Sequence, residues 1–208
     1  MPYLHEFLAL TIIHLLAVMS PGPDFAIILR QSISFGRKTA ILTSFGIGAG
    51  IAVHVGYTLL GIGLLISQSP TLMMVAKLIG AAYISYLGVN LLRSQPSTAG
   101  NNIRIDNNPK HQKKAFMMGF MTNVFNPKVT LFFLAIFTTV VSANTPIFVQ
   151  SFYGLWIIVT SIAWFSLVSF LFSKPVVRQK FLKNGHWFER VMGVILLIFA
   201  IKLVLELI

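Results

Sequence analysis

Residues 39–76, TAILTSFGIGAGIAVHVGYTLLGIGLLISQSPTLMMVA, contain no Asp, Glu, Lys or Arg. A membrane-spanning helix needs about 20 apolar residues, so this stretch is too long for one span and has the length of two. The turn-like sequence Ser67-Gln68-Ser69-Pro70 divides it. The sequence therefore predicts one spanning helix over residues 39–66 and a second over residues 72–92.

The rest of the chain repeats this pattern of long apolar runs and short polar connectors. Of the 208 residues 56% are hydrophobic and 10% are charged, whereas a soluble domain carries about 25% charged residues. We therefore predict an all-α membrane protein with six transmembrane helices in a single transmembrane domain, 1–208. The four further helices are expected at 4–29, 115–141, 148–172 and 187–207.

A polar linker at about 93–114, rich in Ser, Asn, Pro, Gly and basic residues, divides the chain into two halves. Each half, about 1–92 and about 115–208, is expected to hold three spans. Because three is an odd number, the second half must run through the membrane opposite to the first. The sequence therefore predicts two inverted three-helix repeats, an arrangement known from transporters.

The formal net charge of +11 is unevenly distributed. The connectors after the first, third and fifth helices hold twelve of the 16 Lys and Arg residues, with Arg190 at the edge as a thirteenth, whereas Lys77 and Lys202 fall on the other side. Basic residues favour the cytoplasmic side, so we expect the linker in the cytoplasm and both termini outside. The charges lie in short connectors and form no long basic face, which argues against nucleic acid as a partner. The thirteen are Arg30, Arg37, Lys38, Arg93, Arg104, Lys110, Lys113, Lys114, Lys174, Arg178, Lys180, Lys183 and Arg190.

Two proline-containing motifs interrupt the first and fourth predicted helices. Pro21-Gly22-Pro23 cannot lie in an unbroken helix, because proline has no N–H to donate. Pro127 interrupts the run 115–141 in the same way. Lipid cannot satisfy the backbone carbonyls that such a break frees, so they must bond to protein or to cavity water. Matching breaks in the two halves are a sequence indicator of a transporter binding site.

Asp24 and Lys128 are charged residues next to these breaks. A charge near the centre of the bilayer costs about 3 kcal/mol and normally faces a partner or a wet cavity. Asp24 is a candidate contact for substrate or proton, or alternatively the N-cap of a helix over 25–36. Lys128 is a candidate substrate contact, or alternatively its side chain snorkels to the cytoplasmic surface. We predict that both belong to one site.

Four further polar residues in the apolar runs are candidates for the same site. Asn123 and Asn126 could contact the solute or satisfy freed backbone groups. His14 and His54 could relay protons, or be buried neutral hydrogen-bonding groups. Neither histidine has a second ligand at a metal-binding spacing and the chain has no Cys, so no metal site is expected. Gly46 and Gly50 form a small-xxx-small face that predicts close helix packing.

Two motifs and their surroundings resemble the LysE superfamily of amino-acid exporters. They are Ser20-Pro21-Gly22-Pro23-Asp24-Phe25 and Asn126-Pro127-Lys128, accompanied by Arg37-Lys38 and the glycine-rich run that follows. Within the superfamily, the chain is most similar to the RhtB family of homoserine and threonine efflux proteins. The resemblance extends over essentially the whole chain.

The resemblance implies a bacterial inner-membrane exporter of neutral amino acids driven by the proton gradient, with no cofactor and no enzymatic activity. The expected partners are the amino-acid substrate, protons and membrane lipid, and the sequence is compatible with a homo-oligomer. In this interpretation Asp24 binds the ammonium group or a proton, and Lys128 or the N-termini of the half-helices bind the carboxylate. The alternatives are an exporter of other small metabolites, a channel or a membrane scaffold; an intramembrane enzyme lacks support because no catalytic motif is present.

Overall fold

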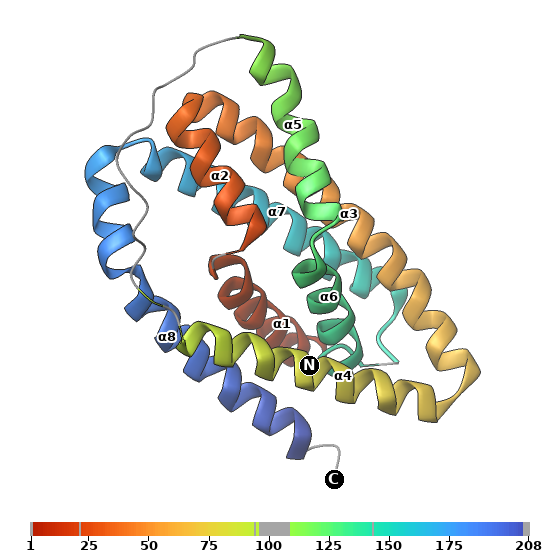
Figure 1. The fold of residues 1–208 in the computed structure, drawn as a ribbon. Coiled ribbons are helices and arrows are strands. Elements are labelled where there is room, and N and C mark those ends of the chain that lie inside the picture. The colour runs from red at the N-terminus through yellow and green to blue at the C-terminus, as the bar shows by residue number, and fades with distance from the viewer. Residues whose placement is uncertain (1, 21, 94, 96–108, 143, 206–208) are drawn as a thin grey trace.

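Helices make up the regular structure of the computed structural model, which describes residues 2–20, 22–93, 95, 109–142 and 144–205 (Figure 1). No strand occurs among these residues, so the prediction of an all-α protein is confirmed. The helices are α1 (Pro2–Met19), α2 (Pro23–Ser34), α3 (Gly36–Gln68), α4 (Pro70–Leu92), α5 (Pro109–Val124), α6 (Pro127–Thr139), α7 (Ile147–Phe172) and α8 (Pro175–Leu205).

The predicted break in the first helix separates α1 from α2. The segments Tyr3–Met19 and Pro23–Ile33 are bent by 53° relative to each other. Pro23 is the first residue of α2, a position that suits proline because its missing N–H has no partner to lose there. Pro21, part of the predicted break, lies outside the described residues. A second elbow follows at Gly36, whose φ of +79° is one that glycine adopts readily.

The break in the fourth predicted helix separates α5 from α6 at an angle of 56°. Pro127 is the first residue of α6, and the Asn126 side chain caps this helix by accepting a hydrogen bond of 3.0 Å from the Lys128 backbone N–H. Both predicted breaks are therefore present, and each is followed at once by a new helix.

Two helices are by themselves long and apolar enough to cross a membrane: α3 over Gly36–Gly61 and α7 over Ile147–Phe172. Counting each bent pair as one span raises the number to 4 within the described residues. Large apolar side chains point outward on these helices, as on Leu60, which is 75% exposed, and Phe148, which is 82% exposed. Such faces are compatible with lipid and unfavourable in water. The six spans and the inverted repeats remain predictions.

Three helices begin at least three residues earlier than the sequence-based prediction. α8 begins at Pro175 and not near 187, so most of the predicted basic connector 174–183 is helical. α5 begins at Pro109, within the predicted linker. α3 begins at Gly36 and not at 39. Hydropathy identifies only the part of a helix that lipid could surround, whereas the backbone stays helical until a turn or a proline ends it. Pro109 and Pro175 each occupy the first position of their helix, where proline is favoured.

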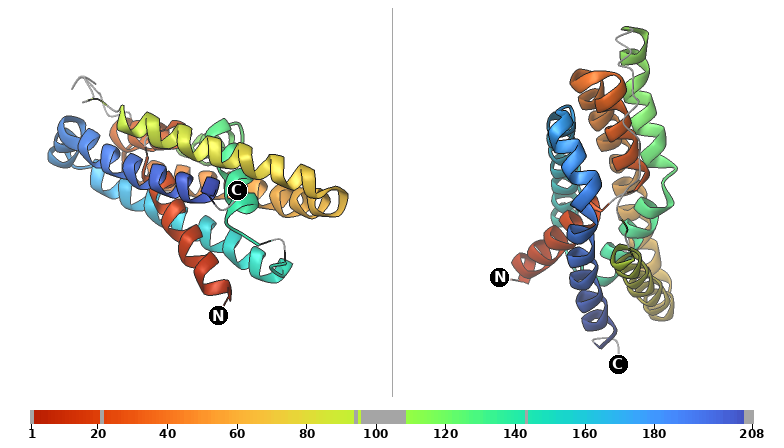
Figure 2. Two further views of the ribbon diagram at one scale, coloured as in Figure 1. Left: turned by 90° about the horizontal axis from the view of Figure 1, so that it is seen from below. Right: turned by 60° about the vertical axis from the view of Figure 1, so that its left-hand side comes forward.

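The two halves of the chain pack against each other. α3 lies against α5 and α7, and α4 lies beside α8 (Figures 1 and 2). A Cβ atom at Gly46 would lie 2.0 Å from the Phe116 carbonyl oxygen, and one at Gly119 would lie 2.2 Å from that of Thr43. The backbones of α3 and α5 therefore touch through glycine, which confirms the packing role predicted for Gly46, whereas Gly50 faces the Asn123 side chain.

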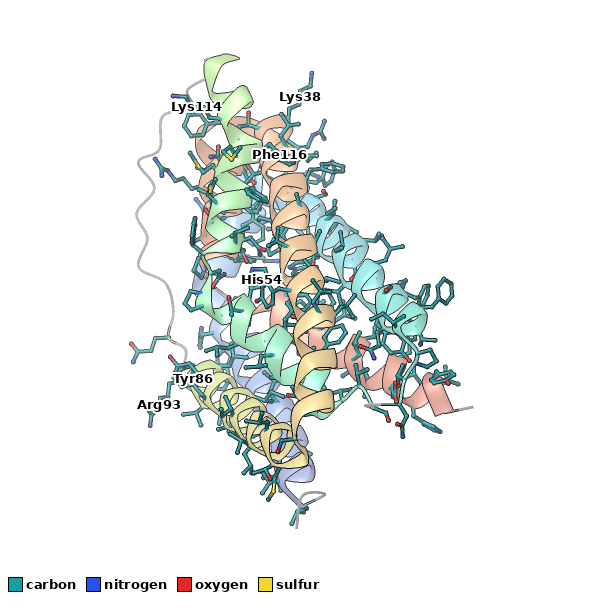
Figure 3. The ribbon with its side chains drawn as sticks, turned by 90° about the vertical axis from the view of Figure 1, so that its right-hand side faces the viewer. Lys38, His54, Tyr86, Arg93, Lys114 and Phe116 are labelled. Atoms are coloured by element: carbon teal, nitrogen blue, oxygen red, sulfur yellow. The ribbon has the colours of Figure 1, made fainter. Side chains whose placement is uncertain are left out.

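Basic side chains from separate connectors gather at one end of the molecule. Figure 3 shows Lys38 and Lys114 together at this end. Arg37 and Lys174 approach the Phe170 ring, each 5.3 Å from its centroid. Arg93, at the C-terminus of α4, was grouped with these residues in the sequence-based prediction but lies well away from them (Figure 3).

The glycine contacts generate a prediction on stability. Gly46→Ala and Gly119→Ala should each lower the free energy of unfolding by about 1–3 kcal/mol, because the added methyl group meets backbone that cannot move aside easily. The measurement is the midpoint of thermal unfolding of the detergent-solubilised protein. Gly56→Ala is the matched control on α3, since nothing lies within 4 Å of its Cβ position. Equal midpoints for all three variants would contradict this account of the packing.

Candidate functional site

A cavity lies where the two helix breaks meet. Its volume is about 60 Å³. Its wall has a polar part next to the breaks and an apolar part farther along. The polar part includes Ser20, Gly22, Asp24, Asn123, Asn126 and Lys128, and the apolar part includes Phe25, Ile51, Phe132, Phe133, Ile157 and Phe165.

Asp24 connects the first break to the second. Its side chain is buried, and its Oδ2 atom accepts hydrogen bonds from the Asn123 amide at 2.9 Å and the Asn126 amide at 3.1 Å. Its Oδ1 atom is also buried and has no hydrogen-bond partner among the described residues. Gly22 is the N-cap of α2, and Asp24 makes no capping bond there. The capping alternative is therefore not what the structure contains.

Lys128 connects the second break to the first. It lies in the first turn of α6, and its Nζ atom donates hydrogen bonds to the Ser20 carbonyl at 3.0 Å and to the Ser20 hydroxyl. A methyl group at Gly22 would come within 3.3 Å of the Lys128 side chain, so the absence of a side chain there makes room for it. The Lys128 side chain is thus directed into the first break and does not snorkel. Its positive charge also attracts the Asp24 carboxylate.

Asn123 and Asn126 have structural roles besides any contact with solute. Both are almost completely buried, at 0% and 3% exposure. The Asn126 side chain uses its oxygen to cap α6 and its amide to bind Asp24. The Oδ1 atom of Asn123 is buried without a partner among the described residues. It lies 2.7 Å from where a Cβ of Gly50 would be, so glycine at 50 admits this side chain.

His54 lies behind Asn123, and the residues that line the cavity do not include it. Its Nε2 atom is 3.0 Å from the Asn123 carbonyl and its Nδ1 atom is 2.6 Å from the Tyr57 hydroxyl. Because a carbonyl can only accept, the hydrogen-bond network places the proton on Nε2 and makes Nδ1 the acceptor. In an unbroken helix, the Asn123 carbonyl would bond to the N–H of residue 127, which is proline. The Asn126 backbone N–H bonds to this carbonyl at 2.9 Å, and His54 supplies a second donor from a side chain.

His14 lines the cavity on its apolar side. It is 3% exposed, and its Nε2 atom is 3.0 Å from the Thr160 hydroxyl and 3.4 Å from the Ser161 hydroxyl of α7. Within the described residues, no three His, Asp or Glu side chains gather as metal ligands would.

The structure therefore brings the breaks, Asp24, Lys128, both asparagines and His14 together around one cavity. His54 does not line this cavity but contacts it through the Asn123 carbonyl. Whether these residues bind substrate or protons stays a prediction. Sequence reasoning missed the role of Ser20 as the partner of Lys128, and it missed Ser161 entirely. The one available signal for Ser161 is a hydroxyl in the uncharged, apolar run Ile147–Phe172.

Comparison with known proteins gives a consistent result. The family model for "LysE type translocator" matches residues 15–207. The "Threonine efflux protein" of Salmonella typhi is 28% identical over 205 residues, which cover 96% of this chain and 98% of that relative. Its namesake in Escherichia coli K12 is 29% identical over 207 residues with the same coverage. An "Uncharacterized membrane protein" of Haemophilus influenzae is 28% identical over 200 residues, covering 95% of each chain. No solved structure matches this chain.

The position of His54 leads to a prediction on stability. His54→Phe keeps a ring that can stack on Phe133, as the imidazole does at 5.8 Å between centroids, but removes the donor to Asn123. The Asn123 carbonyl keeps the Asn126 backbone N–H at 2.9 Å as a partner, so we expect the free energy of unfolding to fall by about 0.5–1.5 kcal/mol, the contribution of one hydrogen bond. His54→Gln, which retains an N–H donor, should lose less. Thermal unfolding of the purified variants measures both, and a midpoint for His54→Phe equal to the wild type would refute the supporting role.

Proposed function

The chain belongs to the LysE type translocator family, and we propose that it exports small neutral amino acids, such as threonine and homoserine, across the bacterial inner membrane in exchange for protons. The family is one of translocators and not of enzymes. The names of the threonine efflux relatives support the choice of substrate. The observation that carries the proposal is the cavity at the two helix breaks, which has Asp24 and Lys128 in its wall.

The cavity chemistry fits a zwitterion. An amino acid presents an ammonium and a carboxylate group, and the cavity holds one carboxylate and one ammonium of its own. The buried Oδ1 atom of Asp24 lacks a hydrogen-bond partner among the described residues and would accept from the substrate ammonium. Lys128 would bind the substrate carboxylate, exchanging one or both of its Ser20 contacts for it. Charge-assisted hydrogen bonds of this kind are stronger than neutral ones.

Proton coupling in this proposal rests on competition at Asp24. A single carboxylate oxygen cannot hold a proton and also accept a full bond from an ammonium group. Release of the amino acid on the outside frees Asp24 to take up a proton, and release of that proton inside restores the anion. The inward proton gradient then drives export. Alternating access would come from the two halves, as in other transporters built on inverted repeats.

We propose the membrane orientation from the distribution of charge. The end at which Lys38 and Lys114 lie (Figure 3), together with Arg37 and Lys174 at Phe170, would face the cytoplasm. Both termini would then lie outside.

The transport test compares Asp24→Asn with the wild type. Export of labelled threonine from inverted vesicles or cells should require the proton gradient in the wild type and lose that dependence in the variant. Exchange of labelled for unlabelled threonine can persist, because an asparagine oxygen still accepts from an ammonium group. Asp106→Asn, which removes a carboxylate from the polar linker, is the control and should transport normally.

Other outcomes separate the alternatives. Wild-type transport by Asp24→Asn would remove Asp24 from the proton step. Flux that does not saturate and ignores the proton gradient would favour a channel. The absence of flux for a whole panel of amino acids would favour a different metabolite or a scaffold.

A topology test uses the absence of cysteine from the chain. Ser142 and Ser173 are both exposed and flank the 26 residues of α7. This helix is about 39 Å long, which exceeds the hydrocarbon core of about 30 Å. A membrane-impermeant thiol reagent applied to intact cells should label Ser142→Cys and leave Ser173→Cys unlabelled until the cells are opened. The reverse pattern would place the termini inside.

A further inference from the structure

The apolar part of the cavity wall contains a second pair of polar side chains, away from Asp24 and Lys128. His14 of α1 and Ser161 of α7 both line the cavity and are 3% and 0% exposed. Apolar residues surround them: the Phe132 ring lies 6.1 Å from the His14 ring, and Ile157 and Phe165 line the same part of the wall. Polar groups in such surroundings need hydrogen-bond partners.

Within this pair, the Ser161 hydroxyl can still form a hydrogen bond with a ligand. The Thr160 hydroxyl donates to the Trp156 carbonyl at 2.6 Å, so it accepts from His14, whose proton is then on Nε2. The Ser161 hydroxyl is 3.4 Å from the same Nε2 atom, which is longer than an ordinary N–H···O bond. A hydroxyl with only a long contact can rotate to donate to, or accept from, a ligand in the cavity.

Resting on the proposed function, we infer that the Ser161 hydroxyl, beside His14, forms the subsite for the side-chain hydroxyl of a hydroxy amino acid. The Asp24–Lys128 end would bind the amino and carboxyl groups, which directs the side chain toward the apolar part. In that part of the wall His14 is already bonded to Thr160, so Ser161 is the residue that would bond to the ligand hydroxyl. Phe132, Ile157 and Phe165 would contact the carbon atoms of the side chain.

Threonine and valine make the sharpest pair of probes, because they have nearly the same shape and differ by a hydroxyl in place of a methyl group. The variant is Ser161→Ala, which removes the hydroxyl and leaves the packing. We expect the rate of threonine export at low substrate concentration to fall about two- to tenfold, the equivalent of one hydrogen bond. Valine export should be unchanged, so the ratio of threonine to valine export falls.

The matched control is Ser169→Ala. Ser169 is another fully buried serine of α7, but its hydroxyl donates to the Phe165 carbonyl at 2.7 Å and it is not among the residues that line the cavity. It should leave the ratio of threonine to valine export unchanged. If Ser161→Ala inserts poorly, Ser161→Cys serves as the second variant, because a thiol has similar size and is a weak donor.

The outcomes distinguish the subsite from the proposed function. A wild type that exports neither threonine nor valine refutes the proposed function. A wild type that exports threonine, together with a Ser161→Ala variant whose ratio of threonine to valine export is unchanged, overturns the subsite and leaves the function intact. A selective loss of threonine export in Ser161→Ala, absent from Ser169→Ala, supports the subsite.

Discussion

The structure depends on one constraint: a helix that breaks inside a membrane frees backbone carbonyls that lipid cannot satisfy. Here side chains from the other half of the chain donate to a carbonyl at each break, in one case beside a backbone N–H. Lys128 of α6 binds the Ser20 carbonyl at the end of α1, and His54 of α3 binds the Asn123 carbonyl at the end of α5. Each half therefore supplies a donor to the break of the other half. Asp24 adds a third link, because it accepts from two asparagines of the second half.

The residues that join the two halves are therefore also residues of the proposed binding site. A buried charge that loses its partner costs several kcal/mol, so Lys128 and Asp24 cannot be left without compensation. If a substrate carboxylate takes the Lys128 ammonium, the Ser20 oxygens lose a donor, and the angle between α1 and α2 loses one of its supports. Binding of substrate and geometry of the break would thus be coupled through one hydrogen bond.

The sequence predicted where the chain breaks and which charged residues lie there, but not which groups those residues contact. Proline breaks a helix by its own lack of an N–H, whatever its surroundings. The breaks before Pro23 and Pro127 could therefore be predicted without a structure. The proximity of Asp24 and Lys128 followed from the expected symmetry, and the structure places both in one cavity. Whether Asp24 caps α2 depends on how α2 packs against α5, and a sequence pattern does not contain that information. Ser161 was missed for a similar reason, since only packing shows which face of α7 meets the cavity.

α1 contacts the second half of the chain at its start, in its middle and beyond its end, and these contacts differ in charge. At its start, Glu6 accepts from the Thr145 hydroxyl at 2.8 Å and the Ser142 backbone N–H at 3.2 Å, both in the connection between α6 and α7. In its middle, His14 bonds to Thr160, and beyond its end Lys128 bonds to Ser20. The middle contact joins neutral groups in the core, whereas a charged residue makes each outer contact. Water, protons and a charged substrate compete more readily for charged groups than for a neutral pair in the core, so the two outer contacts of α1 are easier to exchange than the one in its middle.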